Sequence, residues 1–445
     1  MILWSNNMKK YLSILLFILG MCSNSPAMAE KLEPIELELN SQEKYLSLLD
    51  KSTNSTPEFL PDYRVDDYSH EEEFVVEKLE IESGESADML QAELESQPVQ
   101  EDRTVTPIPT LSMIVRKKHP ILPNDRTLLN EHLYFQFDKG PAEDLLVYGA
   151  YRGDLGFNFF NGVGNHMNYD TFMGEAGVVG RLRELPIDYR FSFNFVPVKD
   201  VPYWNAMILD NFITIKAGKH NKVRIGHTRT ANGYEGGMSG YLQPLIMKSQ
   251  ISRTFSNARS LGAKVIGSYD LVDYDIGVFS SDRFLLQFFP GAEFVGNINF
   301  KPLGKTDGKY GKLLLGTSFN VGSRDNYYKN IGFNAAYRYK KFKWDFEYMA
   351  ADGYNGRSTH SSTARAEGFY TTLYYKLTDK IELLARYDQI TPNKDISHKP
   401  QKEYTAGINY RIKGDALKLM INYVYYDNFN HNTGSRFLVA TQLIF

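Results

Sequence analysis

Strict alternation of apolar and polar residues is the feature that most constrains the fold of this chain. From about residue 129 onward, aromatic or aliphatic residues alternate with polar ones in stretches of 8 to 11 residues, as in residues 331–340. Turn residues such as Asn355-Gly356 and Lys413-Gly414-Asp415 separate the stretches. Successive side chains of a β-strand point to opposite faces, so the pattern predicts strands with one apolar and one polar face.

The number and length of these stretches favour a barrel that crosses a membrane. Counting them gives 16 to 19 candidate strands between residue 111 and residue 445. A strand of roughly 9–11 tilted residues crosses a bilayer, and bacterial barrels have even strand numbers. We therefore predict an all-β fold, a transmembrane antiparallel β-barrel of 16 strands, with 18 strands as the alternative.

A soluble sandwich or propeller would also alternate, so other features must separate the two classes. The chain ends on Phe445, which shares one face of its strand with Leu443, Thr441, Val439 and Phe437. An aromatic C-terminus on such a strand resembles the assembly signal of outer-membrane barrels. No run of 18 apolar residues occurs anywhere, which excludes a helical membrane protein.

The first 29 residues have the pattern of a secretory signal peptide. Lys9 and Lys10 precede an apolar stretch of 11 residues, and Ala27 and Ala29 supply small residues before Glu30. A lipid anchor at Cys22 is the alternative, although the preceding Met21 is bulky where a small residue is expected. Cleavage after Ala29 removes the single cysteine, which leaves no disulfide framework and no Cys-rich zinc module. The pattern predicts export to the bacterial outer membrane.

The formal charge of −3 is a cancellation between two parts of the chain. Residues 30–110 carry 6 basic and 22 acidic side chains, whereas residues 111–445 carry 42 basic and 31 acidic ones. The acidic part is poor in aromatic residues, so we expect a largely disordered N-terminal extension. It is either a solvated tail or an arm that docks in the basic part. The domains expected are residues 1–29, 30–110 and 111–445.

Alternation also assigns many bases to the polar face, which is the lumen of a barrel. Seventeen Lys or Arg residues fall on that face against nine Asp or Glu residues. Rings of Arg and Lys select anions, because the potential in the lumen concentrates the counter-ion. Cross-strand pairing, for example Lys343 with Asp345 or Arg386 with Asp388, would neutralise part of this excess. The count predicts a lumen that prefers anions.

Residues 229–260 are the one long break in the strand pattern. A long connection inside a compact domain is usually functional or disordered. In a barrel of this size it can fold into the lumen and narrow it, or it can form an external loop. Six bases on the break or on its flanking strands form the candidate anion pathway: Lys216, Arg224, Arg229, Arg253, Arg259 and Lys264.

Four motifs resemble the phosphate-selective porin O/P family. They are residues 222–228 (KVRIGHT), 259–262 (RSLG), 382–387 (ELLARY) and 418–424 (KLMINYV), within a region from about 200 to 445. The resemblance implies a homotrimeric 16-stranded outer-membrane channel for phosphate or other small anions, with Arg and Lys along the path.

Together, these observations predict a passive porin with anion preference, for phosphate or polyphosphate, surrounded by outer-membrane lipid. Two alternatives are a general, weakly selective porin and a structural barrel that anchors the acidic extension as an interaction arm. In a third, the arm enters the lumen as a gate. We expect no enzyme, since residues 237–241 (GMSGY) lack the last glycine of a nucleophile elbow. No cofactor, metal or nucleic-acid site is expected: no His lies at metal-ligand spacing alongside Cys, and the bases do not cluster with aromatic residues.

Overall fold

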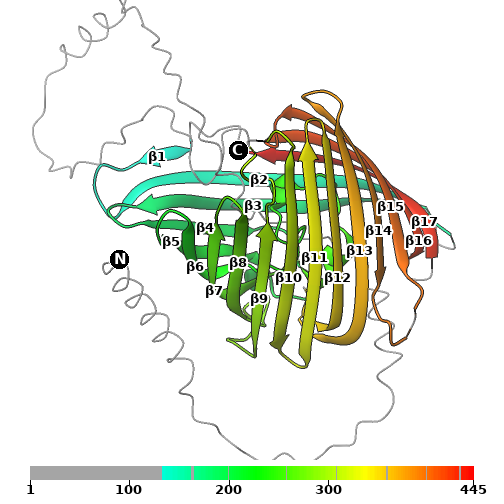
Figure 1. Ribbon diagram of the computed structural model, residues 1–445, viewed down its shortest axis with the longest axis horizontal. Helices are drawn as coiled ribbons and strands as arrows, with labels where there is room; N and C mark the ends of the chain where they lie inside the picture. Colours follow the sequence, from blue (N-terminus) through cyan, green and yellow to red (C-terminus); the bar gives the residue numbers. More distant parts are fainter. Residues whose placement is uncertain are drawn as a thin grey trace, which may run out of the picture. The chain divides into compact units, whose positions relative to one another are not determined.

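The computed structural model describes residues 133–161, 165–198, 200–256, 258–306, 308–356, 359–396, 398–429 and 432–445. Within them, sixteen antiparallel strands form one closed sheet (Figure 1). The strands are β2 (Ala142–Phe160), β3 (His166–Leu182), β4 (Ile187–Asn194), β5 (Ile208–Lys216), β6 (Asn221–Arg229), β7 (Arg259–Ser268), β8 (Val272–Ser280), β9 (Ala292–Phe300), β10 (Lys312–Ser323), β11 (Tyr327–Tyr339), β12 (Phe342–Tyr354), β13 (Ser362–Lys376), β14 (Ile381–Thr391), β15 (Gln401–Lys413), β16 (Leu417–Phe429) and β17 (Asn432–Ile444).

Each strand pairs with its neighbours in the chain, and β17 closes the ring by pairing with β2. The prediction of 16 strands is therefore confirmed over the described residues. A further short strand, β1 (Tyr134–Gln136), pairs with the beginning of β2. It continues the line of β17, because Phe445 pairs with Gly149 and the amide of Val147 donates to the carbonyl of Leu133. The barrel therefore closes along β2, which pairs with both β17 and β1. We call the end where β2 begins the terminus end, and the opposite end the loop end.

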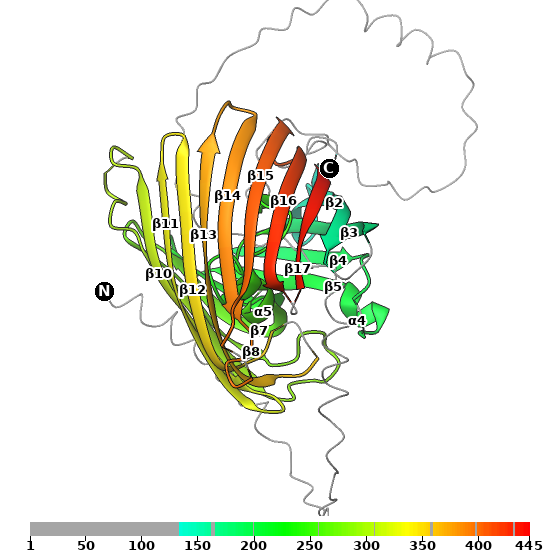
Figure 2. The ribbon, with the colours of Figure 1, turned by 90° about the vertical axis from the view of Figure 1, so that its right-hand side faces the viewer.

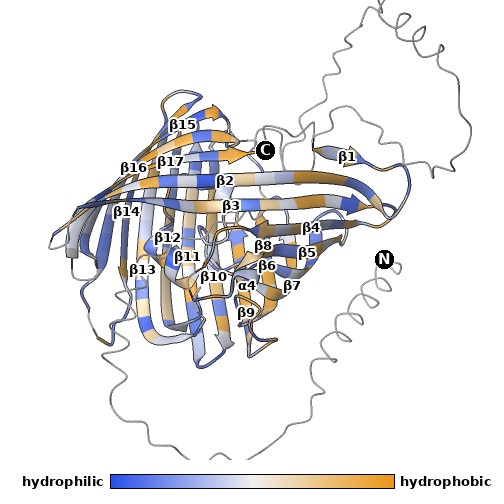
Figure 3. Cartoon of the chain, turned by 180° about the vertical axis from the view of Figure 1, so that it is seen from behind, coloured by the Kyte–Doolittle hydropathy of each residue, from blue (hydrophilic) through white to orange (hydrophobic). Residues whose placement is uncertain are grey.

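The two faces of the sheet differ in polarity, as the alternation predicts. On β15 the inward Glu403, Thr405 and Asn409 are buried, whereas the outward Tyr404 and Ile408 are 43% and 45% exposed. Figure 3 shows this alternation of hydrophilic and hydrophobic residues along the strands. An outer surface of apolar side chains around a polar interior is the arrangement of a transmembrane barrel.

Aromatic rings form a row on the outside of β12 to β16. Phe346, Phe369, Tyr387, Tyr404 and Tyr425 follow one another with ring centroids 5.1–6.1 Å apart. Aromatic girdles of this kind mark the boundary between hydrocarbon and head groups. No helix among the described residues is both long and apolar enough to cross a membrane. The signal peptide and the acidic extension, with the 22 residues that follow, lie outside the described residues.

Candidate functional site

The connection between β6 and β7, residues 230–258, folds into the barrel; we call it the inward segment. Its short helix α5 (Gln250–Phe255) lies inside the ring of strands (Figure 2). The amide of Ile246 donates to Oδ1 of Asn422 on β16 at 2.8 Å, and the amide of Gln250 to Oδ2 of Asp388 on β14 at 2.8 Å. The break therefore crosses the lumen and is not an external loop.

Apolar residues of the inward segment explain why it stays inside. Ile251 and Phe255 are buried with Met349 and Tyr370 of the inner wall, and Ile246 is buried with residues of β16 and β17. The hydroxyl of Ser249 caps α5 by accepting from the amide of Ser252. Backbone groups of the segment that would otherwise be unpaired are satisfied by polar side chains of the wall.

Four of the six candidate residues face each other across β6 and β7. Arg224 lies opposite Lys264, and Arg229 lies opposite Arg259. The guanidinium of Arg224 lies 4.1 Å from the ring centroid of Phe212 on β5. This approach depends on Gly226, which pairs with Phe212 at a φ of +132° and has no room for a Cβ.

Carboxylates neutralise two of these four bases. Nε and Nη2 of Arg259 donate to the two oxygens of Asp210 at 2.6 and 3.2 Å. Nζ of Lys264 donates to Oδ2 of Asp275 at 2.8 Å and to the carbonyl of Arg229 at 3.1 Å. Like charges directly opposite on neighbouring strands are destabilising, and these acids offset that repulsion.

The remaining two candidates lie at different places. Arg253, on α5, donates from Nη2 to Oε1 of Glu403 at 2.6 Å. Lys216 lies at the terminus end of β5, where it pairs with Asp188 at 2.9 Å and is 41% exposed. The length of β6 separates it from Arg229 by roughly 23 Å at about 3.3 Å per residue. Arg253 thus lies within the inward segment, Arg229 and Arg259 adjoin its two ends, Arg224 and Lys264 lie further along β6 and β7, and Lys216 lies apart from all of them.

The excess of inward bases that alternation suggests is not found among the buried side chains. Within the described residues, ten Lys or Arg and twelve Asp or Glu side chains are buried. The inward acids that alternation did not assign include Asp210, Glu235 and Glu403. Charge among the buried side chains is therefore nearly balanced, and the predicted excess of bases along the whole lumen stays a prediction.

Lys248 is a buried base that the sequence reasoning missed. It is fully buried, and Nζ donates to the carbonyls of Gly236 and Met238 at 3.4 and 3.5 Å. Nη1 of Arg229 donates to the same Gly236 carbonyl at 3.2 Å. The only hint in the sequence is a single Lys in an otherwise weakly charged stretch of the break.

Three arginines interact electrostatically with Lys248. Burial, followed by repulsion from Arg229, Arg259 and Arg152, holds the pKa of Lys248 well below its usual range, and Glu235 opposes this effect. Glu235 also accepts from the amide of Ser249 at 2.7 Å and pairs with Arg386 at 3.2 Å. We call Lys248, Arg229, Arg259 and Arg152 the Lys248 cluster.

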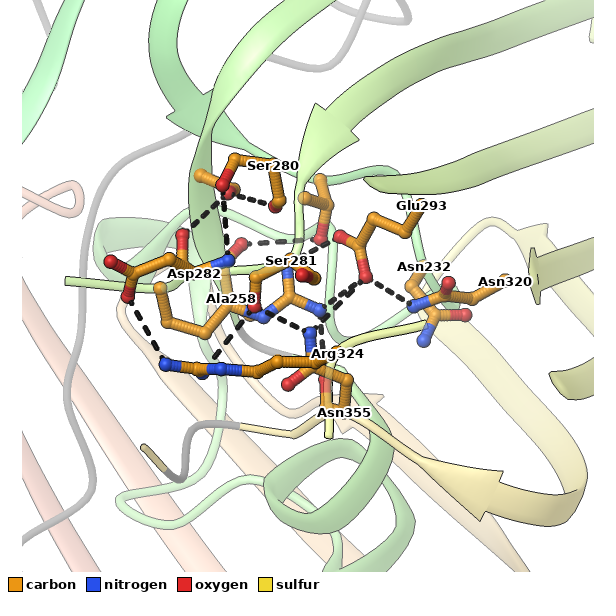
Figure 4. Close-up of polar contacts among 12 residues, drawn as sticks. Asn232, Ala258, Ser280, Ser281, Asp282, Glu293, Asn320, Arg324 and Asn355 are labelled. Carbon is orange, nitrogen blue, oxygen red and sulfur yellow. Dashed lines mark hydrogen bonds and ion pairs between the residues drawn. The ribbon is translucent and has the colours of Figure 1, made fainter. Parts of the chain in front are cut away.

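A second polar group ties the loop end together; we call Asp282, Arg283, Glu293, Arg324 and Asn355 the loop-end cluster (Figure 4). Arg283 forms a two-pronged ion pair with Glu293 on β9, and its Nη2 also donates to the carbonyl of Asn355 at 2.8 Å. Asn355 donates to the carbonyl of Ser281 at 2.8 Å, and Arg324 lies 3.6 Å from Asp282. Three connections between strands are thereby held together.

Comparison with known proteins supports the fold. A solved anion-selective porin from Comamonas acidovorans matches 68% of this chain and 99% of its own, at 10% identity and a TM-score of 0.50. OmpF of Salmonella typhi, solved with daunomycin, matches 68% of this chain and 98% of its own, at 12% identity and a TM-score of 0.51. No curated protein matches the chain.

The closed ring, its apolar exterior and these likenesses define a β-barrel of the bacterial outer membrane with the porin fold. Residues 304–444 match the family model of phosphate-selective porin O and P. The match is consistent with the suspected family and includes the motifs at 382–387 and 418–424. The other two motifs, at 222–228 and 259–262, lie outside the matched residues.

Proposed function

We propose that the protein is a passive channel that prefers anions, with the Lys248 cluster as the element that gives the preference. The observation that carries this proposal is the environment of Lys248. Arg229, Arg259 and Arg152 act on Lys248 there, and Glu235 is the carboxylate that opposes them. Lys and Arg side chains can replace part of the hydration shell of an anion, and weak binding allows it to leave again.

The position of the cluster supports this proposal more than its total charge. Lys248 and Arg229 donate to backbone carbonyls of the inward segment, which carry only partial charge. A charged base held by a carbonyl is not neutralised by its partner, whereas Arg259, held by Asp210, contributes much less. An anion that passes the inward segment would meet this positive potential.

A general, weakly selective porin is the second candidate, favoured by the near balance of buried charges. Phosphate separates the two candidates. In the anion channel, phosphate reduces chloride current with saturation because it occupies a site, whereas a general pore shows no saturable reduction. The choice of phosphate and the homotrimer stay predictions from the resemblance.

Replacing Lys248 with Met is expected to weaken the anion preference. The change removes one buried positive charge and keeps a side chain of similar length. In a planar bilayer with a potassium chloride gradient, the reversal potential should move toward zero. Lys329→Met is the matched control, since Lys329 is exposed and paired with Asp352. Equal reversal potentials for the wild type and Lys248→Met would contradict the assignment to Lys248.

The anion preference is also expected to fall as the pH rises. The pKa of Lys248 is lowered, so the side chain loses its charge as the pH rises through a value well below the usual one of about 10.4. Burial raises the pKa of Tyr241, on the same inward segment, well above its usual range, so that hydroxyl stays neutral. Reversal potentials measured from neutral pH upward should decline in the wild type and less steeply in Lys248→Met. Parallel slopes would assign the titration to other groups.

A further inference from the structure

The terminus end of the barrel carries an excess of exposed bases on one half of its circumference. Four connections lie there between β9 and β16, within residues 301–312, 338–341, 376–380 and 411–416. Nine exposed Lys or Arg side chains lie on or beside these connections, against one exposed acid, Asp379, among the described residues. We call the nine bases the basic rim: Lys305, Lys309, Lys312, Arg338, Lys340, Lys341, Lys376, Lys380 and Lys413.

The other half of the terminus end has no such excess among its described residues. The connections from β1 to β8 expose three lysines and three acids: Lys139, Lys216 and Lys219, and Asp138, Glu184 and Asp270. The charge of the basic rim is therefore a local feature of the half between β9 and β16.

Neighbouring connections of the basic rim touch, so its charges form one surface. The amide of Lys376 donates to the carbonyl of Lys341 at 2.8 Å, and the amide of Arg411 donates to the carbonyl of Lys380 at 2.8 Å. In the strand register, Lys312 also lies directly opposite Arg338. Like charges directly opposite on neighbouring strands are destabilising, so the surface gains stability when an anionic group lies against it.

The barrel itself neutralises little of this charge. Of the eight lysines of the basic rim, only Lys376 forms an ion pair with a described acid, to Asp379 at 3.0 Å. Nζ of Lys309 lies 5.3 Å from the ring centroid of Tyr310. A cation–π contact of this kind holds an ammonium group without removing its charge. Within the described residues the nine bases and Asp379 leave a net charge of +8.

The same chain contains a segment of opposite charge and similar size. Residues 71–102, which we call the acidic stretch, carry twelve Asp or Glu residues and one basic residue, Lys78. Their net charge is therefore −11. Complementary charge favours contact between the acidic stretch and the basic rim.

The chain enters the barrel beside the basic rim. The amide of Val147 on β2 donates to the carbonyl of Leu133, the first described residue, at 2.9 Å. On the adjoining β17, the amide of Ile444 donates to the carbonyl of Ala416, in the connection that follows Lys413, at 2.8 Å.

The distance to the basic rim is within the reach of the acidic stretch. The thirty residues 103–132 separate the stretch from Leu133 and can span up to about 100 Å. Sixteen tilted strands about 4.8 Å apart enclose a barrel roughly 32 Å wide. The acidic stretch can therefore reach every part of the basic rim.

Part of the basic rim faces the lumen, which favours a partner in water over membrane lipid. Lys312 lies on the same face of β10 as the buried Ser318, and Lys376 lies on the same face of β13 as the buried Thr372. Lipid surrounds the outside of a barrel, whereas a polypeptide segment in water has access to both faces at a strand end.

We propose that the basic rim docks the acidic stretch of the same chain at the mouth of the lumen. Exposed ion pairs are individually weak, but the tether makes their formation intramolecular, so several of them together hold the stretch. Docking would lower the positive potential at this mouth. The inference is independent of the proposed anion preference, because it rests on exposed charges and not on the Lys248 cluster.

Carbodiimide cross-linking of the full-length protein in detergent tests the docking. The reagent joins a lysine amine to a carboxylate in contact with it as an amide, and takes up the water that is lost. Mass spectrometry at low salt should find peptides that join residues 71–102 to lysines of the basic rim. Their yield should fall about tenfold in 1 M salt, where charges are screened beyond about 3 Å.

Variants on both sides of the contact sharpen the test. Glu71→Gln/Glu72→Gln/Glu73→Gln should lower the yield about fivefold, because it removes three charges of the acidic stretch and leaves the barrel unchanged. On the barrel, Lys309→Gln/Lys380→Gln should lower the yield at Lys341 by a similar factor. Its matched control is Lys139→Gln/Lys219→Gln, which also removes two exposed lysines of the terminus end but none of the basic rim. The control should leave that yield unchanged.

Four outcomes would overturn the proposal. The first is an equal yield at Lys341 in the two lysine variants, and the second is a wild type that cross-links as often to Lys139 or Lys219 as to the basic rim. The third is loss of the cross-links when phosphatidylglycerol is added, which would assign the basic rim to lipid. The fourth is cross-links that join isotope-labelled to unlabelled chains refolded together, which would place the contact between copies. The reversal potential tests the anion preference separately, so the two proposals can fail independently.

Discussion

Replacing residues 232–256 with a short glycine-rich turn is expected to raise single-channel conductance several-fold. These residues are the part of the inward segment that contacts the wall of β12 to β17. The barrel should still close, because Arg229 and Arg259 are direct partners at the ends of β6 and β7. Paired residues on neighbouring strands lie only about 5 Å apart, so a tight turn can join them.

The same deletion is expected to shift selectivity toward cations. It removes Lys248 and Arg253 but only one acid, Glu235. It also exposes Asp388, which loses its hydrogen bond from the amide of Gln250, and Glu403, which loses its pair with Arg253. Single-channel current and reversal potential, recorded on protein shown to be folded by its heat-dependent gel migration, measure both effects. Unchanged conductance in the folded deletion variant would mean that the segment does not limit the pore.

The sequence predicts the barrel well because the membrane imposes its pattern on every strand. Residues 403–409, for example, lie in a strand with Tyr404 and Ile408 outward and with Glu403, Thr405 and Asn409 inward. Residues 437–444 depart from this pattern, because Leu438 and Ala440 face inward and pack with Ile246 of the inward segment. Strand pairing was also predictable in kind, since short turns between successive strands favour antiparallel neighbours. The inward position of the break could be inferred only from its length and from the lack of strand pattern around it.

The near balance of the buried charges could not be predicted, for reasons that lie in particular residues. Asp210 lies near a register shift between β4 and β5, where alternation no longer gives the face of a residue. Lys248 and Glu235 lie in a segment without any period, and Glu235 pairs with Arg386, which is 151 residues away in the chain. Long-range contacts of this kind leave no local signal.

Replacing Arg283 with Met is expected to lower the free energy of unfolding by about 3–5 kcal/mol, the usual cost of breaking a buried ion pair from one side. Arg283 is 2% exposed and Glu293 is fully buried, so the single variant leaves a carboxylate without its main partner. The remaining donors to Glu293 are the hydroxyl of Tyr328 at 3.0 Å and the side-chain amides of Asn320 at 3.2 Å and Asn355 at 3.5 Å. Urea unfolding in detergent, followed by tryptophan fluorescence, measures the loss.

The double variant Arg283→Met/Glu293→Leu should lose less stability than Arg283→Met alone, because it leaves no buried charge behind. Both variants lose the hydrogen bonds that Arg283 donates to the carbonyls of Asn355 and Gly356. The difference in stability between them therefore reports the cost of the unpaired carboxylate. If those backbone bonds were the main contribution, the two variants would be equally unstable. Equal stability would therefore mean that the cluster stabilises the barrel mainly through hydrogen bonds to the backbone. Greater stability of the double variant would mean that the unpaired carboxylate of Glu293 causes most of the loss in Arg283→Met.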